Sequence, residues 1–422
     1  MPRTLTPIDG CVFMNALYNQ ATGKTDVTNV DASNFASVGE QVLATGTENV
    51  YNSVSIVMGK TLAAVRPYNA KLGIIQAIST GEFTHRLRKI SFYSKDAINA
   101  GFVNTDLYTN LKDGYDNGSN SGNSVPSMWK QDIPPVLEMN FAGSIVWQEE
   151  LTLFEKQISM AFRSPEELAT FLNGVMLNKM NTIEKRKEGF RRGTLLDHIA
   201  MTYLLSTYTS GTTCIDLIAK FNSTYGTSYS RNTILQSHLD DLLKVFVTEF
   251  KLASDYLTEY SSLYHYNPPK TVDGVDYVLN RQTHKADQRS ILYGPLFTRA
   301  KASVLPEIFN PQYLDVKANE FVNYWQSIKS PTEIKIKPSV PIDGNNITSE
   351  NVVLDYFVGI LFDRDAILVD TQWEDSAVTP LEARKKFRNM IWDFSYNPIS
   401  DPTENCVIFY LGAGEVEDDS NA

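Results

Sequence analysis

The longest amphipathic pattern in the chain begins at residue 164 and constrains the fold more than any other feature. Ser164 stands at a helix N-cap position, Pro165 occupies the first helical position, and Glu167 completes a capping box. Apolar residues then recur on one helical face, at Leu168, Phe171, Leu172, Val175, Met176, Met180 and Ile183. The pattern predicts a long helix that passes through a charged segment, 184–192, and continues or restarts through LLDHIAMTYLL.

Two strands are predicted before this helix, at residues 83–93 and 136–147. In the second strand, apolar Leu137, Met139 and Phe141 alternate with polar residues, which is typical of a strand with one apolar and one wet face. A long two-stranded excursion is only marginally stable alone in water. We therefore expect a neighbouring copy of the chain to cover its apolar face, to which Trp147 would also belong.

The connection between these strands contains DGYDNGSNSGNSVPS, residues 113–127, which has almost nothing apolar to bury. Connections longer than about 12–15 residues are uncommon in compact domains and are usually functional or disordered. We expect this segment to be the adaptable tip of an arm that reaches a neighbouring subunit. The anchoring contacts are expected from the flanking strands and from Trp129.

The rest of the chain mixes helical and strand patterns, which predicts an α+β fold class. Helices are predicted at 31–66, 232–263 and 315–328, after a mostly polar N-terminal stretch. Strands are predicted in EIKIK, in NVVLDYFVGILFDRDAILVD with a turn at 363–365, and in RKKFRNMIWDFSYNP. Since the last of these is long and aromatic, we expect a sheet partner and a covered face for it. The acidic tail after Gly412 is expected to fray.

Composition and charge exclude several classes of protein. The 422 residues carry 38 basic and 49 acidic side chains, a net charge of −11, which argues against a protein that coats nucleic acid through clustered Lys and Arg. Cys11, Cys214 and Cys406 have no metal-ligand or disulfide spacing, which fits a reducing cytosol. The start predicts no secretory signal, and no apolar run approaches the ~20 residues of a membrane helix. We expect an intracellular product, or one assembled there.

No motif predicts an active site, and neither enzymatic activity nor a cofactor or metal is expected. Gly23-Lys24-Thr25 lacks the earlier glycine of a phosphate loop, because that position is Tyr18. None of the five histidines has the spacing of a zinc site. Asp363 and Asp365 form a carboxylate pair, but FDRDA favours a turn. The basic clusters at 85–89 and 184–192 are either solvated faces or contacts with acidic partners in an assembly.

The order of these segments resembles the major capsid proteins of tailed bacteriophages, which have the HK97-like major capsid fold. Within that family, the sequence is most similar to capsid proteins of short-tailed Bacillus-type phages and related gut phages. The resemblance rests on ASNFASVGEQVLATGTENVYNSVSIVMGKTL, LFEKQISMAFRSPEELATFLNGVMLNKMNTIE, RQTHKADQRSILYGPLFTRAKASVLPEIFN, GILFDRDAILVD, RKKFRNMIWDFSYNP and ENCVIFYL. These segments span residues 10–412, and each is weak alone.

The resemblance implies a division of the chain. Residues 1–82 would be an N-terminal arm and 83–155 an extended β-hairpin loop. The peripheral domain with its long spine helix would comprise 156–206 and 363–403. The axial domain would comprise 207–362 and 404–412, followed by the acidic tail at 413–422.

The resemblance also implies a function. The protein would self-assemble into hexamers and pentamers of an icosahedral shell that encloses packaged phage double-stranded DNA, which it would touch only loosely. A scaffolding protein during assembly and a portal at one vertex would be its partners, without a membrane. The shell would be assembled in the host cytoplasm and end in the virion. Residues predicted to contact other subunits are Arg86, Arg88, Lys89, Trp129, Leu137, Met139 and Phe141.

Two alternatives stay open from the sequence. The first is an encapsulin-type cellular nanocompartment shell, which shares the fold but holds protein cargo instead of DNA. The second is an intracellular hydrolase that uses Asp363, Asp365 and His284.

Overall fold

The structure of the protein is a computed structural model with two compact units. It describes residues 6–23, 30–45, 70–81, 86–95, 135–154, 157, 160–208, 212–268, 270–272, 275–303, 318–341, 347–380, 382, 384–412 and 415–417. Unit 1 comprises Met1–His85, Ala142–Gly193 and Val369–Pro398. Unit 2 comprises Arg86–Phe141, Thr194–Leu368 and Ile399–Ala422.

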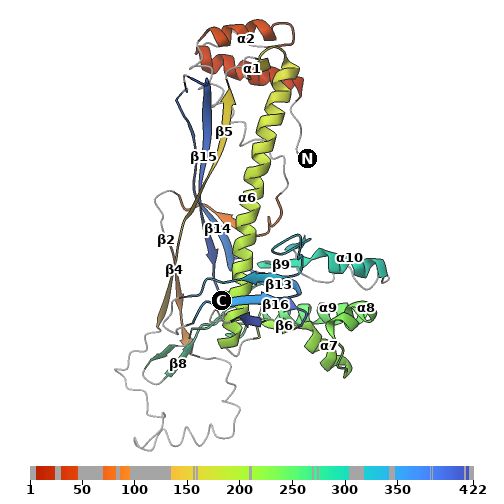
Figure 1. Ribbon diagram of the computed structural model, residues 1–422. Helices are drawn as coiled ribbons and strands as arrows, with labels where there is room; N and C mark the ends of the chain where they lie inside the picture. Colours follow the sequence, from red (N-terminus) through yellow and green to blue (C-terminus); the bar gives the residue numbers. More distant parts are fainter. Residues whose placement is uncertain are drawn as a thin grey trace, which may run out of the picture. The chain divides into compact units, whose positions relative to one another are not determined.

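Unit 1 begins with two helices that lie against each other, α1 (Pro7–Thr22) and α2 (Phe35–Ala44) (Figure 1). Thr6 and Asp9 form a capping box at the start of α1, and Gly23 ends the helix in the left-handed conformation with φ 64°. The N-terminal stretch is therefore helical, which the sequence analysis did not predict. Of the predicted helical range 31–66, α2 confirms the first part, and residues 46–66 lie outside the described residues.

The predicted long helix is confirmed as α6 (Pro165–Tyr208), a single helix of 44 residues. The Ser164 hydroxyl accepts the Glu167 N–H at 3.2 Å, as the N-cap pattern predicts. The helix continues through the charged segment into LLDHIAMTYLL without a break. Leu168, Met180 and Ile183 are buried, as the periodicity predicts.

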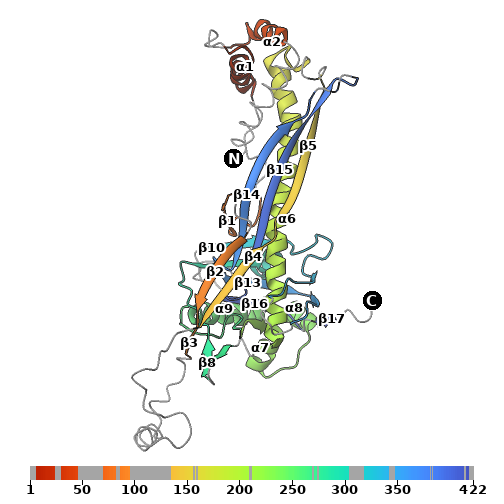
Figure 2. The same cartoon turned by 90° about the vertical axis from the view of Figure 1, so that its left-hand side faces the viewer.

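The main sheet of unit 1 has the strand order β1-β14-β15-β5 (Figures 1 and 2). Its strands are β1 (Gln76–Ile78), β14 (Ile367–Val378), β15 (Phe387–Ser400) and β5 (Ile145–Phe154). β15 pairs with β5 antiparallel over ten residues, so the predicted aromatic strand has its sheet partner. Its face is covered by α6, because Trp147 of β5 packs between Phe394 of β15 and Phe190 of α6.

Unit 2 is built on a five-stranded sheet with the order β10-β9-β13-β16-β6. The strands are β10 (Ala318–Val322), β9 (Gln288–Tyr293), β13 (Phe357–Asp363), β16 (Cys406–Tyr410) and β6 (Cys214–Asp216). Every residue of β13 is buried, as expected for a strand covered on both faces.

Two successive residues of β16, whose side chains point to opposite faces of the sheet, show what covers it. Tyr410 contacts Tyr203 of α6, whereas Phe409 packs against Phe246 and Phe250 of α9 (Leu239–Tyr256). Helix α10 (Gly294–Ser303) joins α9 through the Phe246–Phe297 contact. The five-stranded sheet of unit 2 is therefore covered by α6 on one face and by α9 on the other.

Of two helix predictions for unit 2, one is confirmed in part and one is wrong. The predicted helix 232–263 is broken at His238 into α8 (Arg231–Ser237) and α9, and α9 ends at Tyr256, before the paired prolines. The predicted helix 315–328 is not helical where it is described, because residues 318–322 form β10, which pairs in parallel with β9. This pairing joins segments distant in sequence, so local periodicity does not reveal it.

The remaining elements complete the predicted α+β class. They are α7 (Leu217–Tyr225) and three small sheets: β11 (Ile334–Ile336) with β12 (Asn351–Leu354) and β17 (Glu415–Glu417); β3 (Ser94–Lys95) with β8 (Val275–Val278) and β7 (Lys270–Val272); and β2 (Arg86–Phe92) with β4 (Val136–Ala142). The predicted strand EIKIK is confirmed by β11. Part of the tail is ordered, since β17 pairs with β12.

Candidate assembly surface

β2 and β4 form a two-stranded sheet in unit 2, at the two ends of the segment 96–134, which lies outside the described residues together with Trp129 (Figure 2). The Tyr93 N–H donates to the Pro135 carbonyl oxygen at 3.0 Å and so closes the far end of the pair. The predicted strand 83–93 therefore pairs with the first part of the predicted strand 136–147. The second part of that prediction is wrong, because the strand ends at Ala142 and residues from Ile145 onward form β5 in the sheet of unit 1. Because side chains alternate along each strand, the pair has two distinct faces.

The inner face of β2–β4 is bound to unit 2 itself. Leu137 packs against a buried cluster of Tyr93, Tyr277 and Leu279. On the same face, the Lys89 ammonium group forms ion pairs with Asp401 and Glu404. The inner face is therefore held by its own chain through apolar and ionic contacts.

The outer face of β2–β4 carries exposed apolar side chains beside basic ones. Ile90, Phe92 and Val136 are 50%, 66% and 50% exposed, although each is a large apolar residue. Arg86 and Arg88 lie on this face as well, and Arg88 pairs with Glu138 at 2.8 Å. The Arg88–Glu138 pair is exposed, and such pairs contribute about 1 kcal/mol or less. This surface, called the hairpin outer face below, is apolar with an excess of positive charge.

The structure places the predicted contact residues on both faces of the hairpin. Arg86 and Arg88 belong to the outer face, whereas Lys89 and Leu137 are engaged within the chain. Met139 and Phe141 are half-buried and share the register of Leu137. Their contact with another subunit stays a prediction. Trp147, predicted to be covered by a neighbouring copy, is instead covered by α6.

Sequence reasoning did not single out the exposed apolar residues Ile90, Phe92 and Val136. A signal was present, because Ile90 and Phe92 share the strand register of Arg86 and Arg88. The sequence alone does not tell which of two faces its own chain covers. The inner face is fixed by residues such as Asp401, which follow more than 300 positions later in the chain.

A second exposed sheet face lies in unit 1, on the side of β5 and β15 opposite α6. Cross-strand pairs line it, with the Gln148 amide donating to Asp393 at 2.6 Å and the Thr152 hydroxyl to Asn389 at 2.8 Å. Val146 and Phe154 are 61% and 43% exposed. The β5 and β15 residues of this side that are not buried are Val146, Gln148, Glu150, Thr152, Phe154, Phe387, Asn389, Ile391 and Asp393. They include two acidic residues and no basic one, so this surface, the sheet outer face, is apolar and acidic.

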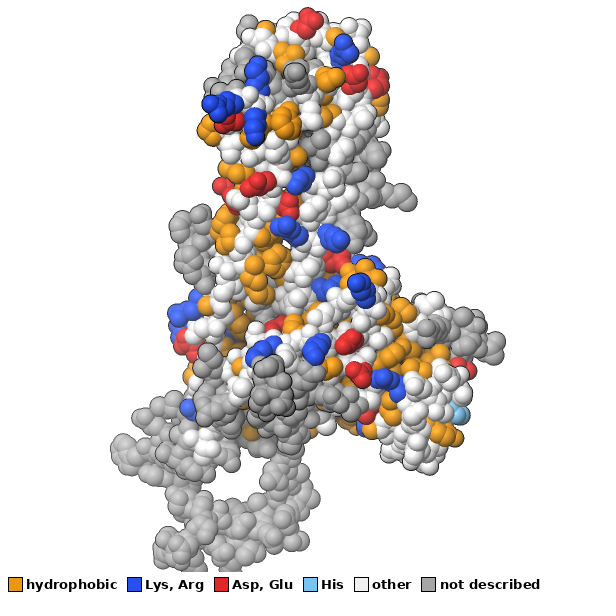
Figure 3. Space-filling view, viewed as in Figure 1, with side chains coloured by type: hydrophobic (Ala, Val, Ile, Leu, Met, Phe, Trp, Pro, Cys, Tyr) orange, Lys and Arg blue, Asp and Glu red, His pale blue; other side chains and the backbone are white. Residues whose placement is uncertain are grey.

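The basic cluster at 184–192 is largely used inside unit 1. Arg186 and Lys179 form ion pairs with the buried Glu149 at 3.1 and 3.2 Å. Lys187 pairs with Glu374 at 2.9 Å, and the guanidinium of Arg186 lies 5.3 Å from the Trp147 ring centroid. On the side of the molecule that Figure 3 views, blue Lys and Arg side chains are interspersed with red Asp and Glu side chains over the described residues. These contacts fix α6 to its sheet.

The carboxylate pair at 363–365 has a structural role. Asp363 accepts the Asp365 N–H at 2.9 Å and the Thr283 hydroxyl at 2.7 Å, so the predicted turn is confirmed. Burial raises the pKa of Asp363. His284 is exposed and contributes its carbonyl oxygen to the neighbouring turn. Within the described ranges, no group of three or more His, Cys, Asp or Glu side chains is placed to hold a metal ion.

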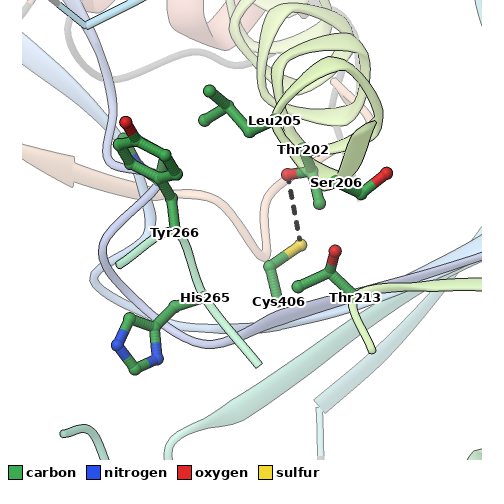
Figure 4. A pocket seen from close by; sticks show the side chains of 8 residues that line it. Thr202, Leu205, Ser206, Thr213, His265, Tyr266 and Cys406 are labelled. Carbon is green, nitrogen blue, oxygen red and sulfur yellow. Dashed lines mark hydrogen bonds between the residues drawn. The ribbon is translucent and has the colours of Figure 1, made fainter. Parts of the chain in front are cut away.

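A small cavity in unit 2 lies between the end of α6 and residues 265–266 (Figure 4). Its walls carry the side chains of Thr202, Leu205, Ser206, Thr213, His265, Tyr266, Pro402 and Cys406. The Thr202 hydroxyl points to the Cys406 sulfur at 3.8 Å. Burial raises the pKa of the Cys406 thiol, which therefore stays protonated and unreactive.

The helices that the structure describes include none long and apolar enough to cross a membrane.

No protein-family model matches the sequence, and no curated protein matches it. Among solved structures, a chain of the capsid of Staphylococcus phage Andhra aligns at 8% identity and a TM-score of 0.48, covering 82% of this chain and 85% of that one. A chain from a structure of the head fiber and inner core protein gp22 of native bacteriophage P68 aligns at 12% identity and a TM-score of 0.45, covering 82% and 88%. A chain of the capsid of Cyanophage P-SCSP1u aligns at 9% identity and a TM-score of 0.42, covering 80% and 86%.

Proposed function

We propose that the chain is a shell-forming subunit, the major capsid protein of a tailed bacteriophage, and that copies join through the two exposed sheet faces. One observation carries this proposal: among the described residues, two sheet faces carry exposed apolar side chains together with charges of opposite sign. The hairpin outer face offers Ile90, Phe92 and Val136 beside Arg86 and Arg88. The sheet outer face offers Val146 and Phe154 beside Glu150 and Asp393.

Such a pair of faces favours contact between copies of the chain. Charged groups of opposite sign steer encounter and fix register, and the apolar side chains supply burial. Because the two faces differ, the contact is heterologous, with the hairpin of one copy on the sheet of the next. Heterologous contacts generate rings when the rotation closes. Hexameric and pentameric rings of this kind are the building units of an icosahedral shell.

The charge distribution fits a container for DNA. A net charge of −11 opposes tight binding to phosphate groups. Two basic residues of the α6 cluster, Arg186 and Lys187, are paired with Glu149 and Glu374. The shell would therefore enclose packaged double-stranded DNA while binding its phosphate groups only weakly. In this proposal a scaffolding protein and a portal act during assembly in the host cytoplasm, and the product is the virion shell.

The predicted division into arm, extended loop, peripheral domain and axial domain is part of the same proposal. α6 would be the spine helix, and β2–β4 the base of the extended loop. The five-stranded sheet with α9 would belong to the axial domain.

The test is particle formation by the purified chain, scored by negative-stain microscopy and sedimentation, for wild type and for Phe92→Asp. A charge placed in an apolar contact is costly to desolvate, so Phe92→Asp is expected to abolish closed particles while leaving a folded subunit. Ile328→Asp is the matched control, since Ile328 is 76% exposed elsewhere in unit 2. Equal particle yield from Phe92→Asp and wild type would contradict the proposed contact.

A charge-reversal pair tests the partner face. Arg86→Glu and Glu150→Lys should each reduce particle yield at low salt, and the double variant should regain part of it. Additive loss in the double variant would argue that the two faces do not meet. The nucleic-acid content of particles recovered from infected cells separates a virus shell from an encapsulin-type compartment.

A further inference from the structure

Residues 400–405, from the last residue of β15 to the residue before β16, form a turn that several distant segments of unit 2 contact. The Tyr266 N–H donates to the Pro402 carbonyl at 2.8 Å, and the Asp363 N–H donates to the Asn405 carbonyl at 2.9 Å. The Asp401 carboxylate accepts the N–H and hydroxyl of Thr403 at 2.9 and 2.7 Å, which fixes the shape of the turn. We call residues 400–405 the hub turn.

One side of the hub turn holds β2. The Lys89 ammonium group forms ion pairs with Asp401 and Glu404. Arg281 donates to the Thr403 carbonyl at 3.0 Å and to the Ser91 hydroxyl at 2.7 Å. Lys89 and Ser91 are two positions apart in β2, so both point from the same face of the strand toward the turn. The attachment of β2 thus depends on the position of the hub turn.

Two histidines contact the hub turn from within unit 2. His198 of α6 is fully buried, and its Nδ1 lies 3.0 Å from the Ser400 hydroxyl. Its Nε2 has no hydrogen-bond partner among the described residues. His265 is also buried, with Nδ1 3.1 Å from the Asn405 side-chain oxygen and Nε2 2.8 Å from the Leu279 carbonyl.

A proton on either ring would strain the closed turn. At His198 it would create an N–H donor without an acceptor in a site that water does not reach, and such a buried charged donor is costly. At His265 the Asn405 side-chain oxygen and the Leu279 carbonyl would accept the two N–H groups of the charged ring. The cost of burying the charge nevertheless exceeds the stabilisation from these hydrogen bonds. Burial lowers the pKa of His198 to about 4 and that of His265 to about 4, in each case against smaller opposing effects.

The charged neighbours of the two rings are few. Asp401 faces both histidines and favours their protonated forms, and Arg281 disfavours it at His265. Burial raises the pKa of Glu404 against the attraction of Lys89 and Arg281. Its protonation favours the closed turn, opposite in sign to the histidines. The variant Glu404→Gln removes this opposing contribution.

We propose that the hub turn is an acid-sensitive clasp, in which protonation of His198 and His265 opens the turn and releases β2 while the five-stranded sheet stays closed. In the open state the rings reach water, and their proton affinity returns to that of an ordinary histidine. The opening equilibrium then rises as pH falls from about 6.5 toward 4, by on the order of tenfold to a hundredfold per histidine at pH 4.5. This device belongs to the chain itself and does not depend on the proposed shell.

The test is hydrogen–deuterium exchange of the full-length chain between pH 7 and 4.5, corrected for intrinsic exchange. The peptide that contains β2 should lose protection by at least about tenfold across this range, while the β13 peptide keeps its protection. The double variant His198→Gln, His265→Gln should move the loss to lower pH. Simultaneous loss in β2 and β13, or a midpoint unchanged in the double variant, would overturn the proposal.

Two further variants serve as a control and as an independent test of how β2 is attached. His284→Gln replaces an exposed histidine and should behave as wild type, and a shifted midpoint in this variant would count against the clasp. Lys89→Met should expose β2 at pH 7 without acid and leave β13 protected. This variant tests the attachment even where a histidine variant fails to fold. Full protection of β2 in Lys89→Met would show that the hub turn does not hold the strand.

Discussion

Trp147 of β5 and Phe394 of β15 stack with ring centroids 4.2 Å apart and an interplanar angle of 16°. They occupy facing positions in the antiparallel pairing, on the side of the sheet that α6 covers. Phe190 of α6 completes the contact at 6.0 Å. The stack is therefore a direct link between the sheet of unit 1 and its covering helix.

Removal of this ring should destabilise unit 1. Trp147→Ala is expected to lower the free energy of unfolding by about 2–4 kcal/mol, below the usual range for a fully buried tryptophan because this ring is half-buried. Val146→Ala, one position away on the exposed face, should cost less than about 1 kcal/mol. Urea unfolding followed by circular dichroism measures both. Similar losses in the two variants would contradict the assigned faces.

The close approach of α1 to the start of α6 predicts opposite effects for two glycine substitutions. A Cβ at Gly10 would lie 2.8 Å from the Pro165 carbonyl oxygen, whereas a Cβ at Gly189 has no neighbour within 4 Å. Gly10→Ala should destabilise the contact by about 1–3 kcal/mol. Gly189→Ala should stabilise the chain by up to about 1 kcal/mol through helix propensity. Thermal unfolding of both variants tests the sign, and a neutral Gly10→Ala would refute the close approach.

The buried Glu149 should matter more than the exposed Glu138. Glu149→Gln leaves Lys179 and Arg186 without their shared carboxylate and is expected to cost about 1–3 kcal/mol, less than a fully buried pair because Arg186 is partly exposed. Glu138→Gln removes the partner of Arg88 at an exposed site and should change stability by about 0.5 kcal/mol or less. Denaturant titration at pH 7 compares them. Equal effects would show that the α6 ion pairs are as weak as a surface pair.

Stability should fall with acid. The pKa of His198 is lowered to about 4 from 6.5, and that of His265 likewise, so the unfolded chain binds more protons between these values. The free energy of unfolding therefore decreases as pH drops from 6.5 toward 4, by up to about 3 kcal/mol per histidine. Urea unfolding at pH 7, 5.5 and 4.5 measures the slope. A constant free energy over this range, matched in His198→Gln, would contradict the buried neutral state of both rings.

Capping residues and apolar periodicity, which are local in the sequence, predicted the elements that they define. The N-cap at Ser164 and the 3.6-residue period gave α6, and the alternation around Trp392 gave β15. Helix α1 could also have been found, because Thr6, Pro7 and Asp9 are a capping box with proline at the first helical position. Its amphipathic pattern is weak and polar residues surround it in the sequence, so apolar periodicity did not indicate this helix.

Distant contacts explain what the sequence did not reveal. Residues 318–322 form a strand because β9 offers a parallel edge. His238 leaves the helical conformation, with φ −131° and ψ 30°, and the helical period does not indicate this break. For the candidate site, the paired strands and the basic residues Arg86 and Arg88 were predictable. The choice of outer face was not, because it depends on Asp401 and Glu404, far along the chain.

The most direct test of the central proposal is cryo-electron microscopy of particles formed by the purified chain. The account predicts closed shells in which Phe92 of each subunit lies on the sheet outer face of the next, against β5 and β15. Basic residues Arg86 and Arg88 should then lie within ion-pair distance of acidic residues on that face. A chain that stays monomeric at all salt concentrations, with and without a scaffolding protein, would contradict the account. Shells in which Ile90 and Phe92 remain exposed to solvent would contradict it as well.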